Sequence, residues 1–187
     1  MPKVRLRFKS ASEIVDVGGE GLLLLTDEQQ KRQIAVVCNL KKLKDIAQGI
    51  DGKKKYETNL AQTLWRILED YGVELEIYID AIKEQQYHAI VCDTDSSARF
   101  PICMTDAVLL VIISKGSVPL YMDERLFDNQ SSPYNGGLEG VQLPVNVITN
   151  QMLFSALDKA IKDENYELAS HLRDEIRRRK ASAEENE

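Results

Sequence analysis

The chain has 187 residues, a length typical of one domain with a small appendage. Hydrophobic residues make up 43% of it, enough for a sizeable core, and its formal net charge is −6. This charge excludes a global attraction to nucleic acid or anionic membranes, so either would need a local basic patch. No apolar run approaches the ~20 residues of a membrane span, and basic residues interrupt the N-terminus where a signal peptide would be apolar. We therefore expect a cytoplasmic protein without membrane association.

The number and placement of the cysteines are consistent with a cytoplasmic protein. Cys38, Cys92 and Cys103 are odd in number, and each lies in an apolar run. This pattern indicates reduced thiols in a core rather than a disulfide framework.

The first part of the chain alternates strands and helices. Residues 3–9 alternate apolar and basic side chains, which predicts a half-buried strand whose basic face is either solvated or directed at phosphate. The apolar runs 22–25 and 34–38 predict a hairpin. Helical spacing over 40–50 and 60–71 predicts two helices that end at glycines, with the apolar residues of each facing the core and Trp65 between core and surface.

The first of these helices and the connection after it form the most basic locality of the sequence. Closely spaced lysines usually belong to a solvated surface, but they also suit contacts with phosphate or with a partner. We take six of them as candidate nucleic-acid-binding residues: Lys41, Lys42, Lys44, Lys53, Lys54 and Lys55.

The central part continues with strands. Period-two alternation predicts strands over 73–80 and 87–92, and a further strand over 99–102. Asp93 and Asp95 in the intervening turn could hold Mg²⁺, although acidic turn pairs are far commoner than metal sites. Residues 118–122 predict a short strand, which Pro119 places at a sheet edge or at the start of a strand.

The stretch 101–116 predicts the central core helix. Thr105 can cap its N-terminus, and Asp106 lies where the helix dipole favours a carboxylate. Residues 107–113 are apolar on every face, as in a buried helix, and Gly116 can end it. Asp106 is a candidate general base or metal ligand, and the alternative is a carboxylate that simply starts the helix.

The C-terminal part is a separate unit. Residues 129–150 predict a linker or long loop, with a late strand where 141–147 alternate. Residues 151–180 predict an αα-hairpin too small to bury much apolar surface alone, so its apolar face indicates a protein partner. Its last turn carries the basic run 177–180, and residues 181–187 predict a disordered acidic tail. The whole chain is predicted to be α+β, with a mixed or antiparallel sheet of about seven strands, about three helices, and this hairpin.

Common catalytic motifs are absent from the sequence. It has no CxxC, HExxH, Walker or GxSxG pattern. His88 and His171 are the only histidines and lie far apart, so we predict no metal site from them.

The C-terminal hairpin resembles the UVR motif of the bacterial excision-repair proteins UvrB and UvrC. The runs Tyr166-Glu167-Leu168-Ala169 and Leu172-Arg173-Asp174-Glu175-Ile176 carry the likeness. The resemblance implies a helical hairpin that docks onto another such hairpin or a partner protein. The residues it implies for docking are Leu157, Ile161, Tyr166, Ala169, Leu172, Arg173 and Ile176.

Residues 1–128 resemble the bifunctional nuclease family. The likeness lies in the order of the strands and helices, the glycines Gly52 and Gly72, and the run Thr105-Asp106-Ala107. It implies DNase and RNase activity, with Asp106 and Thr105 in the site and Mg²⁺ or Mn²⁺ as a possible cofactor only if the nuclease is active.

The sequence also departs from that family. The family's Arg-Pro-x-Thr-His-Asp run falls on residues 57–62, where none of its polar residues is kept. An arginine of the family falls on Cys103 and a carboxylate on Lys42. Two hypotheses follow: a nuclease-family protein acting on DNA or RNA, or an inactive domain that works as a protein-interaction module through residues 153–180. The sequence leaves homo-oligomerisation open.

Overall fold

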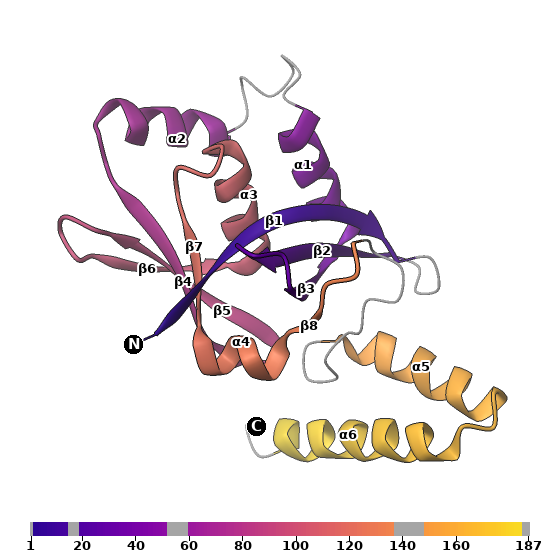
Figure 1. Cartoon of the computed structure of the whole chain (residues 1–187). Coiled ribbons are helices and arrows are strands. Elements are labelled where there is room, and N and C mark those ends of the chain that lie inside the picture. The colour runs from indigo at the N-terminus through magenta and orange to yellow at the C-terminus, as the bar shows by residue number, and fades with distance from the viewer. Residues whose placement is uncertain (1, 15–18, 52–59, 137–147, 185–187) are drawn as a thin grey trace.

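A computed structural model of the chain describes residues 2–14, 19–51, 60–136 and 148–184 (Figure 1). These residues confirm the predicted α+β class with a mixed sheet. The strands are β1 (Lys3–Glu13), β2 (Glu20–Asp27), β3 (Arg32–Asn39), β4 (Leu75–Lys83), β5 (Gln86–Asp93), β6 (Arg99–Cys103), β7 (Leu120–Asp123) and β8 (Ser132–Pro133). The helices are α1 (Leu40–Asp51), α2 (Leu60–Asp70), α3 (Met104–Ile113), α4 (Glu124–Gln130), α5 (Asn150–Lys162) and α6 (Tyr166–Glu184).

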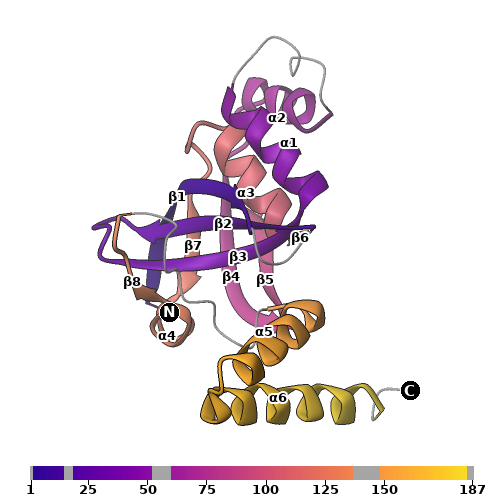
Figure 2. The same ribbon diagram turned by 90° about the vertical axis from the view of Figure 1, so that its right-hand side faces the viewer.

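The described strands form one sheet in the order β6-β5-β4-β7-β1-β2-β3-β8. The pair β4–β7 is parallel, and the other neighbouring pairs are antiparallel. Figure 2 shows that β2 and β3 run across the direction of β4 and β5, so the sheet twists strongly. Helices α1 and α3 contact each other and cover the same side of the sheet.

Strand β7 lies inside the sheet, between β4 and β1, so of the two predicted alternatives the sheet edge is wrong and the start of the strand fits. Pro119 precedes the first strand residue, where no ladder N–H is required of it. Its carbonyl accepts a hydrogen bond from the Ile77 N–H at 2.9 Å. The proline therefore starts the strand without limiting it to an edge.

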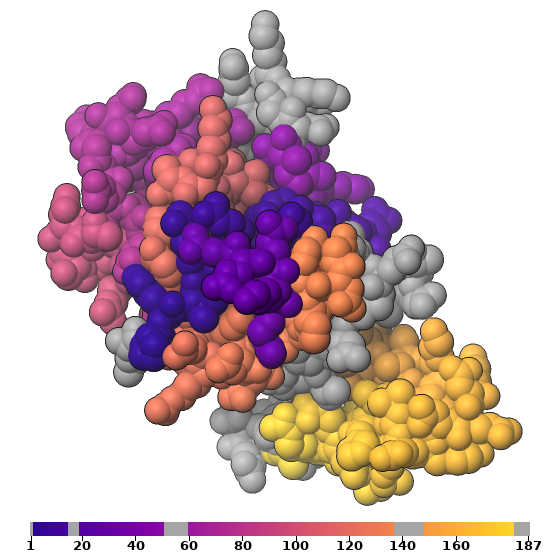
Figure 3. Space-filling view, viewed as in Figure 1, coloured from indigo at the N-terminus to yellow at the C-terminus, as the bar shows by residue number. Residues whose placement is uncertain are grey.

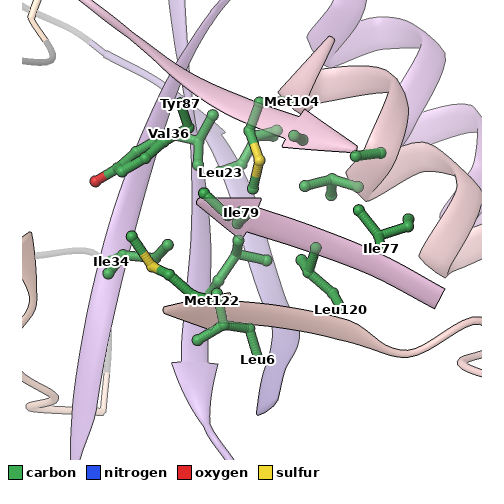
Figure 4. Close-up of a cluster of buried hydrophobic side chains, with 14 of the residues drawn as sticks. Leu6, Leu23, Ile34, Val36, Ile77, Ile79, Tyr87, Met104, Leu120 and Met122 are labelled. Carbon is green, nitrogen blue, oxygen red and sulfur yellow. The ribbon is translucent and has the colours of Figure 1, made fainter. Parts of the chain in front are cut away.

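The main core lies between the sheet and helices α1 and α3. Leu23, Ile77 and Ile79 are fully buried, and Figure 4 shows Leu23 and Ile79 close together within the cluster. Val108 of α3 is fully buried as well. The predicted core helix is confirmed in its first half, while residues 109–113 are only half-buried.

Helix α2 corrects the expected orientation of its apolar face. Trp65 is buried at 8% exposure, whereas Leu60, Leu64, Ile67 and Tyr71 are 71%, 50%, 46% and 82% exposed. Helical spacing identifies an apolar stripe but does not determine which side of the helix meets the core. Here the side that carries the large indole ring packs inward.

The predicted linker is partly structured. Helix α4, which the sequence pattern did not predict, extends to Gln130, and β8 pairs with the edge of β3. Arg32 fixes this segment, because its Nε donates to the Ser131 hydroxyl at 2.7 Å and Nη2 donates to the Ser131 carbonyl at 2.8 Å. The predicted strand over 141–147 lies outside the described residues.

Helices α5 and α6 form the predicted hairpin, with the turn at 163–165 and Glu164 at φ 56°. The hairpin has a small core of its own, which includes Leu153 and Leu172 and which Ile14 and Val37 extend from the main domain. It projects from the rest of the molecule (yellow and light orange in Figure 3). Helix α6 continues to Glu184, so residues 181–184 do not belong to a disordered tail as predicted. Within the described residues, no helix combines the length and apolar character needed to cross a bilayer.

Candidate functional site

Asp106 lies in the first turn of α3, as predicted, and its carboxylate is ion-paired with the Lys42 ammonium of α1. The two side chains are 40% and 36% exposed, respectively. The hydrogen bond that Lys42 donates to the Asp106 carboxylate raises the pKa of Lys42, against the lowering effect of partial burial. The Asp106 carboxylate is therefore already paired with an ammonium group of the same chain.

Thr105 does not cap α3, which corrects the prediction. The capping position is Cys103, with no side-chain hydrogen bond to the helix, and Thr105 is a buried residue within the first turn. The Thr105 hydroxyl instead lies 3.2 Å from the Cys103 thiol. The predicted and observed capping positions are two residues apart, and sequence spacing does not resolve such a difference.

Three of the six candidate lysines lie in the described part of the chain, all of them on α1. Lys41 and Lys44 are exposed on α1, whereas Lys42 is engaged by Asp106. Lys53, Lys54 and Lys55 lie outside the described residues. The structure thus leaves two freely solvated lysines of the six on α1.

Divalent cations need several oxygen ligands together. Within residues 2–14, 19–51, 60–136 and 148–184, no three His, Cys, Asp or Glu side chains gather as a metal-ion site would require. At Asp106 the neighbouring charged group is an ammonium, which repels a cation. The donor set at Asp106 therefore does not fit Mg²⁺ or Mn²⁺.

The other acidic candidate, Asp93, has a local structural role. Its carboxylate accepts hydrogen bonds from the Asp95 and Ser96 N–H groups and from the Ser96 hydroxyl. These bonds, the Ser96 hydroxyl first, lower the pKa of Asp93. Such an Asx turn explains the acidic pair without a metal.

A cavity of about 280 Å³ opens beside the N-terminus of α3. It lies between the main domain and the start of α5. Its charged and polar lining residues include Glu20, Lys42 and Thr105, and both Cys38 and Cys103 face it. Burial raises the pKa of the Cys38 thiol to about 11 and also raises the pKa of Glu20. Because of its raised pKa, the Cys38 thiol is protonated near neutral pH and is a weak nucleophile.

The residues predicted to bind a protein partner divide into two groups. Ala169 and Leu172 are buried inside the hairpin, and Leu157 and Ile176 pack against that same core, so these four hold α5 and α6 together. The remaining three are exposed: Ile161, Tyr166 and Arg173. The sequence pattern also missed Phe154, an apolar residue that is 48% exposed on α5.

The basic run 177–180 contains a buried arginine. Arg179 is 9% exposed, and its Nη1 donates to the Ile148 carbonyl at 2.8 Å and to Asn150 Oδ1 at 2.9 Å. Nη1 also reaches Gln85 Oε1 in the β4–β5 turn at 3.1 Å. Arg179 thus ties α6 both to the start of α5 and to the main domain. Its position one heptad after Leu172, on the inner face of α6, is the sequence signal that could have identified it.

Neither the protein-family models nor the curated proteins searched contain a match to this chain.

Proposed function

We propose that this chain is a non-catalytic interaction protein whose C-terminal hairpin docks onto a helical hairpin of a partner protein. The observation that carries the proposal is the exposed apolar surface of the hairpin, which remains after the hairpin has completed its own core. Phe154, Ile161 and Tyr166 are 48%, 52% and 69% exposed. Phe154 and Ile161 lie two turns apart on one side of α5, and Tyr166 opens α6 across the turn.

The ion pair between Lys42 and Asp106 supports the non-catalytic half of the proposal. A metal-dependent nuclease uses carboxylates to hold the ion that activates water and neutralises phosphate charge. Here Lys42 occupies the position where the resembling family carries a carboxylate, and it pairs with the one carboxylate that the chain keeps. The pair links α1 to α3, which is a structural role.

The attachment of the hairpin supports the docking half. Arg179 and the contacts of Ile14 and Val37 hold the inner face of the hairpin against the main domain. A partner would therefore meet the hairpin in one fixed orientation, with its outer apolar residues presented. Pre-orientation of this kind lowers the entropic cost of association.

The test compares the full chain with two variants that each place a carboxylate at an exposed apolar position. Ile161→Glu alters the hairpin, and Leu64→Glu on α2 is the matched control, because these side chains are 52% and 50% exposed. We expect affinity capture from the source cells to recover a helical-hairpin partner with the unmodified chain and with Leu64→Glu, but not with Ile161→Glu. Sedimentation equilibrium of the same three proteins detects a second copy of the chain as that partner. Identical partner sets and identical self-association in all three would contradict the proposal.

The second candidate function is the action on DNA or RNA implied by the nuclease resemblance. The observations that favour it are the partial exposure of Asp106 and the solvated lysines Lys41 and Lys44 on the adjoining helix. Nucleic-acid binding through these lysines would weaken steeply with salt. Cleavage assays on single- and double-stranded substrates separate this candidate from the first.

A further inference from the structure

A second and larger cavity, about 720 Å³ in volume, lies at the C-terminal end of α3, whereas the cavity of about 280 Å³ lies at its N-terminal end, and the two share no lining residue. It is bounded by β1, α2, the last turn of α3 and the lead into β7. The volume is in the range of small-molecule sites. Much of its wall is apolar, with Phe8, Ile50, Trp65, Ile112 and Pro119 among the lining residues.

The charges around this cavity are mostly positive, although the whole chain carries −6. Arg5 and Arg7 share the carboxylate of Glu28, at 3.6 and 2.9 Å. Arg66 of α2 and Lys115 after α3 are both exposed, and neither has an ion-pair partner in the part of the chain that the structure describes. Among the described residues, Glu69 is the one acidic residue in the lining. The cavity therefore has two cations that can accept an incoming anion.

Two polar features of the cavity narrow the chemistry of a ligand that it could bind. Gln62 lines the cavity, and its Oε1 atom is buried and has no hydrogen-bond partner among the described residues. This acceptor therefore favours a ligand that carries a hydrogen-bond donor. The C-terminal carbonyls of α3 would oppose an anion if they were free. The carbonyls of Ile112 and Val111 are not free, because they accept hydrogen bonds from the N–H groups of Lys115 and Gly116, respectively.

We propose that this cavity is a binding site for a small organic acid with an apolar, ring-containing body and a hydrogen-bond donor. The apolar body lies against the walls that include Phe8 and Trp65. The anionic group meets Arg66 and Lys115, and the donor reaches Gln62. This site is independent of hairpin docking, since none of its residues belongs to α5 or α6.

The probe for the test is 1-anilinonaphthalene-8-sulfonate, which has a ring body, an N–H donor and one anionic group. Trp65 is the single tryptophan of the chain and lines the cavity, so its fluorescence reports binding there. The neutral analogue N-phenyl-1-naphthylamine shares the rings and the N–H but lacks the sulfonate. We expect saturable, one-to-one quenching of Trp65 by the anionic probe, and weaker binding of the neutral one.

Three variants of the full chain locate the anion. Arg66→Glu removes one cation, and Lys115→Asn removes the other with a residue that tolerates its φ of 54°. Arg125→Glu, at an exposed position on α4 outside the cavity, is the control with the same charge change as Arg66→Glu. We expect Arg66→Glu and Lys115→Asn each to weaken the anionic probe by about 10-fold, the scale of a charge-assisted contact, with the neutral probe changed less than about twofold. Unchanged circular dichroism verifies folding.

Equal affinity of the anionic probe for the unmodified chain, Arg66→Glu and Lys115→Asn would overturn the proposal. So would an absence of saturable Trp65 quenching. Binding that is lost in Leu64→Glu but kept in Arg66→Glu would assign the probe to the exposed face of α2 and would also overturn it.

Discussion

Replacing Arg179 by alanine should loosen the hairpin from the main domain. The guanidinium lies within hydrogen-bond distance of three acceptors besides Glu175: the Ile148 carbonyl, Asn150 Oδ1 and Gln85 Oε1, at 2.8, 2.9 and 3.1 Å. A buried acceptor left without its donor costs about 1 kcal/mol or more. Because water can reach some of the freed groups, we expect a total loss of about 2–3 kcal/mol.

The assay is hydrogen exchange of the backbone amides in α5 and α6, which reports the free energy of local opening. The control is Arg178→Ala, because Arg178 is the adjacent arginine, pairs with the same Glu175 carboxylate at 2.8 Å and has a side chain that is 67% exposed. Removing that exposed pair should cost no more than about 0.5 kcal/mol. The reasoning would be refuted if the two substitutions accelerated exchange equally.

The ion pair of Lys42 and Asp106 should contribute about 0.5–1 kcal/mol to the free energy of unfolding, since both side chains are more than a third exposed. A double-mutant cycle with alanine, measured by urea unfolding, tests this value, and zero coupling energy would contradict it. The pair raises the pKa of Lys42 above 10.5, so its stabilisation is complete below that pH and should be lost as the pH rises through the higher folded-state value. Hydrogen bonds from Arg178 and then Arg179 lower the pKa of Glu175 below 4.5, so the hairpin should lose stability as the pH falls through that lower value. Glu175→Gln should remove this acid dependence from the hydrogen exchange of the α6 backbone amides. Iodoacetamide at pH 8 should modify exposed Cys103 but not Cys38, whose pKa burial raises to about 11, and equal labelling in peptide mass spectrometry would contradict this.

Local features of the fold could be predicted from the sequence. Helix α1, the hairpin turn at 163–165 and the helix before Gly116 depend on nearby periodicity and on residues that end helices, so a short window contains the information. The backbone at Gly116, with φ 81°, shows the left-handed conformation that favours glycine there. Strands β1 and β4 were likewise predicted, because alternation with period two is a local signal.

Features that depend on distant parts of the chain could not be predicted in this way. Lys42 and Asp106 are 64 positions apart, and only the packing of α1 on α3 brings them together. The orientation of α2 depends on which side of the helix meets the core. The side with Trp65 packs inward, whereas the four smaller apolar side chains predicted to face the core are exposed. A catalytic interpretation of Asp106 depended on its neighbours in space, and its nearest charged neighbour is a lysine.

The most direct test of the central proposal, that Asp106 links α3 to α1 and does not cleave phosphodiesters, is a cleavage assay with the full chain. Purified protein and its Asp106→Ala variant would be incubated with single- and double-stranded DNA and RNA in the presence of Mg²⁺ or Mn²⁺. The ion pair of Asp106 with Lys42 predicts no cleavage above buffer by either protein. Cleavage by the unmodified chain that Asp106→Ala abolishes, while the variant keeps its fold, would contradict the claim.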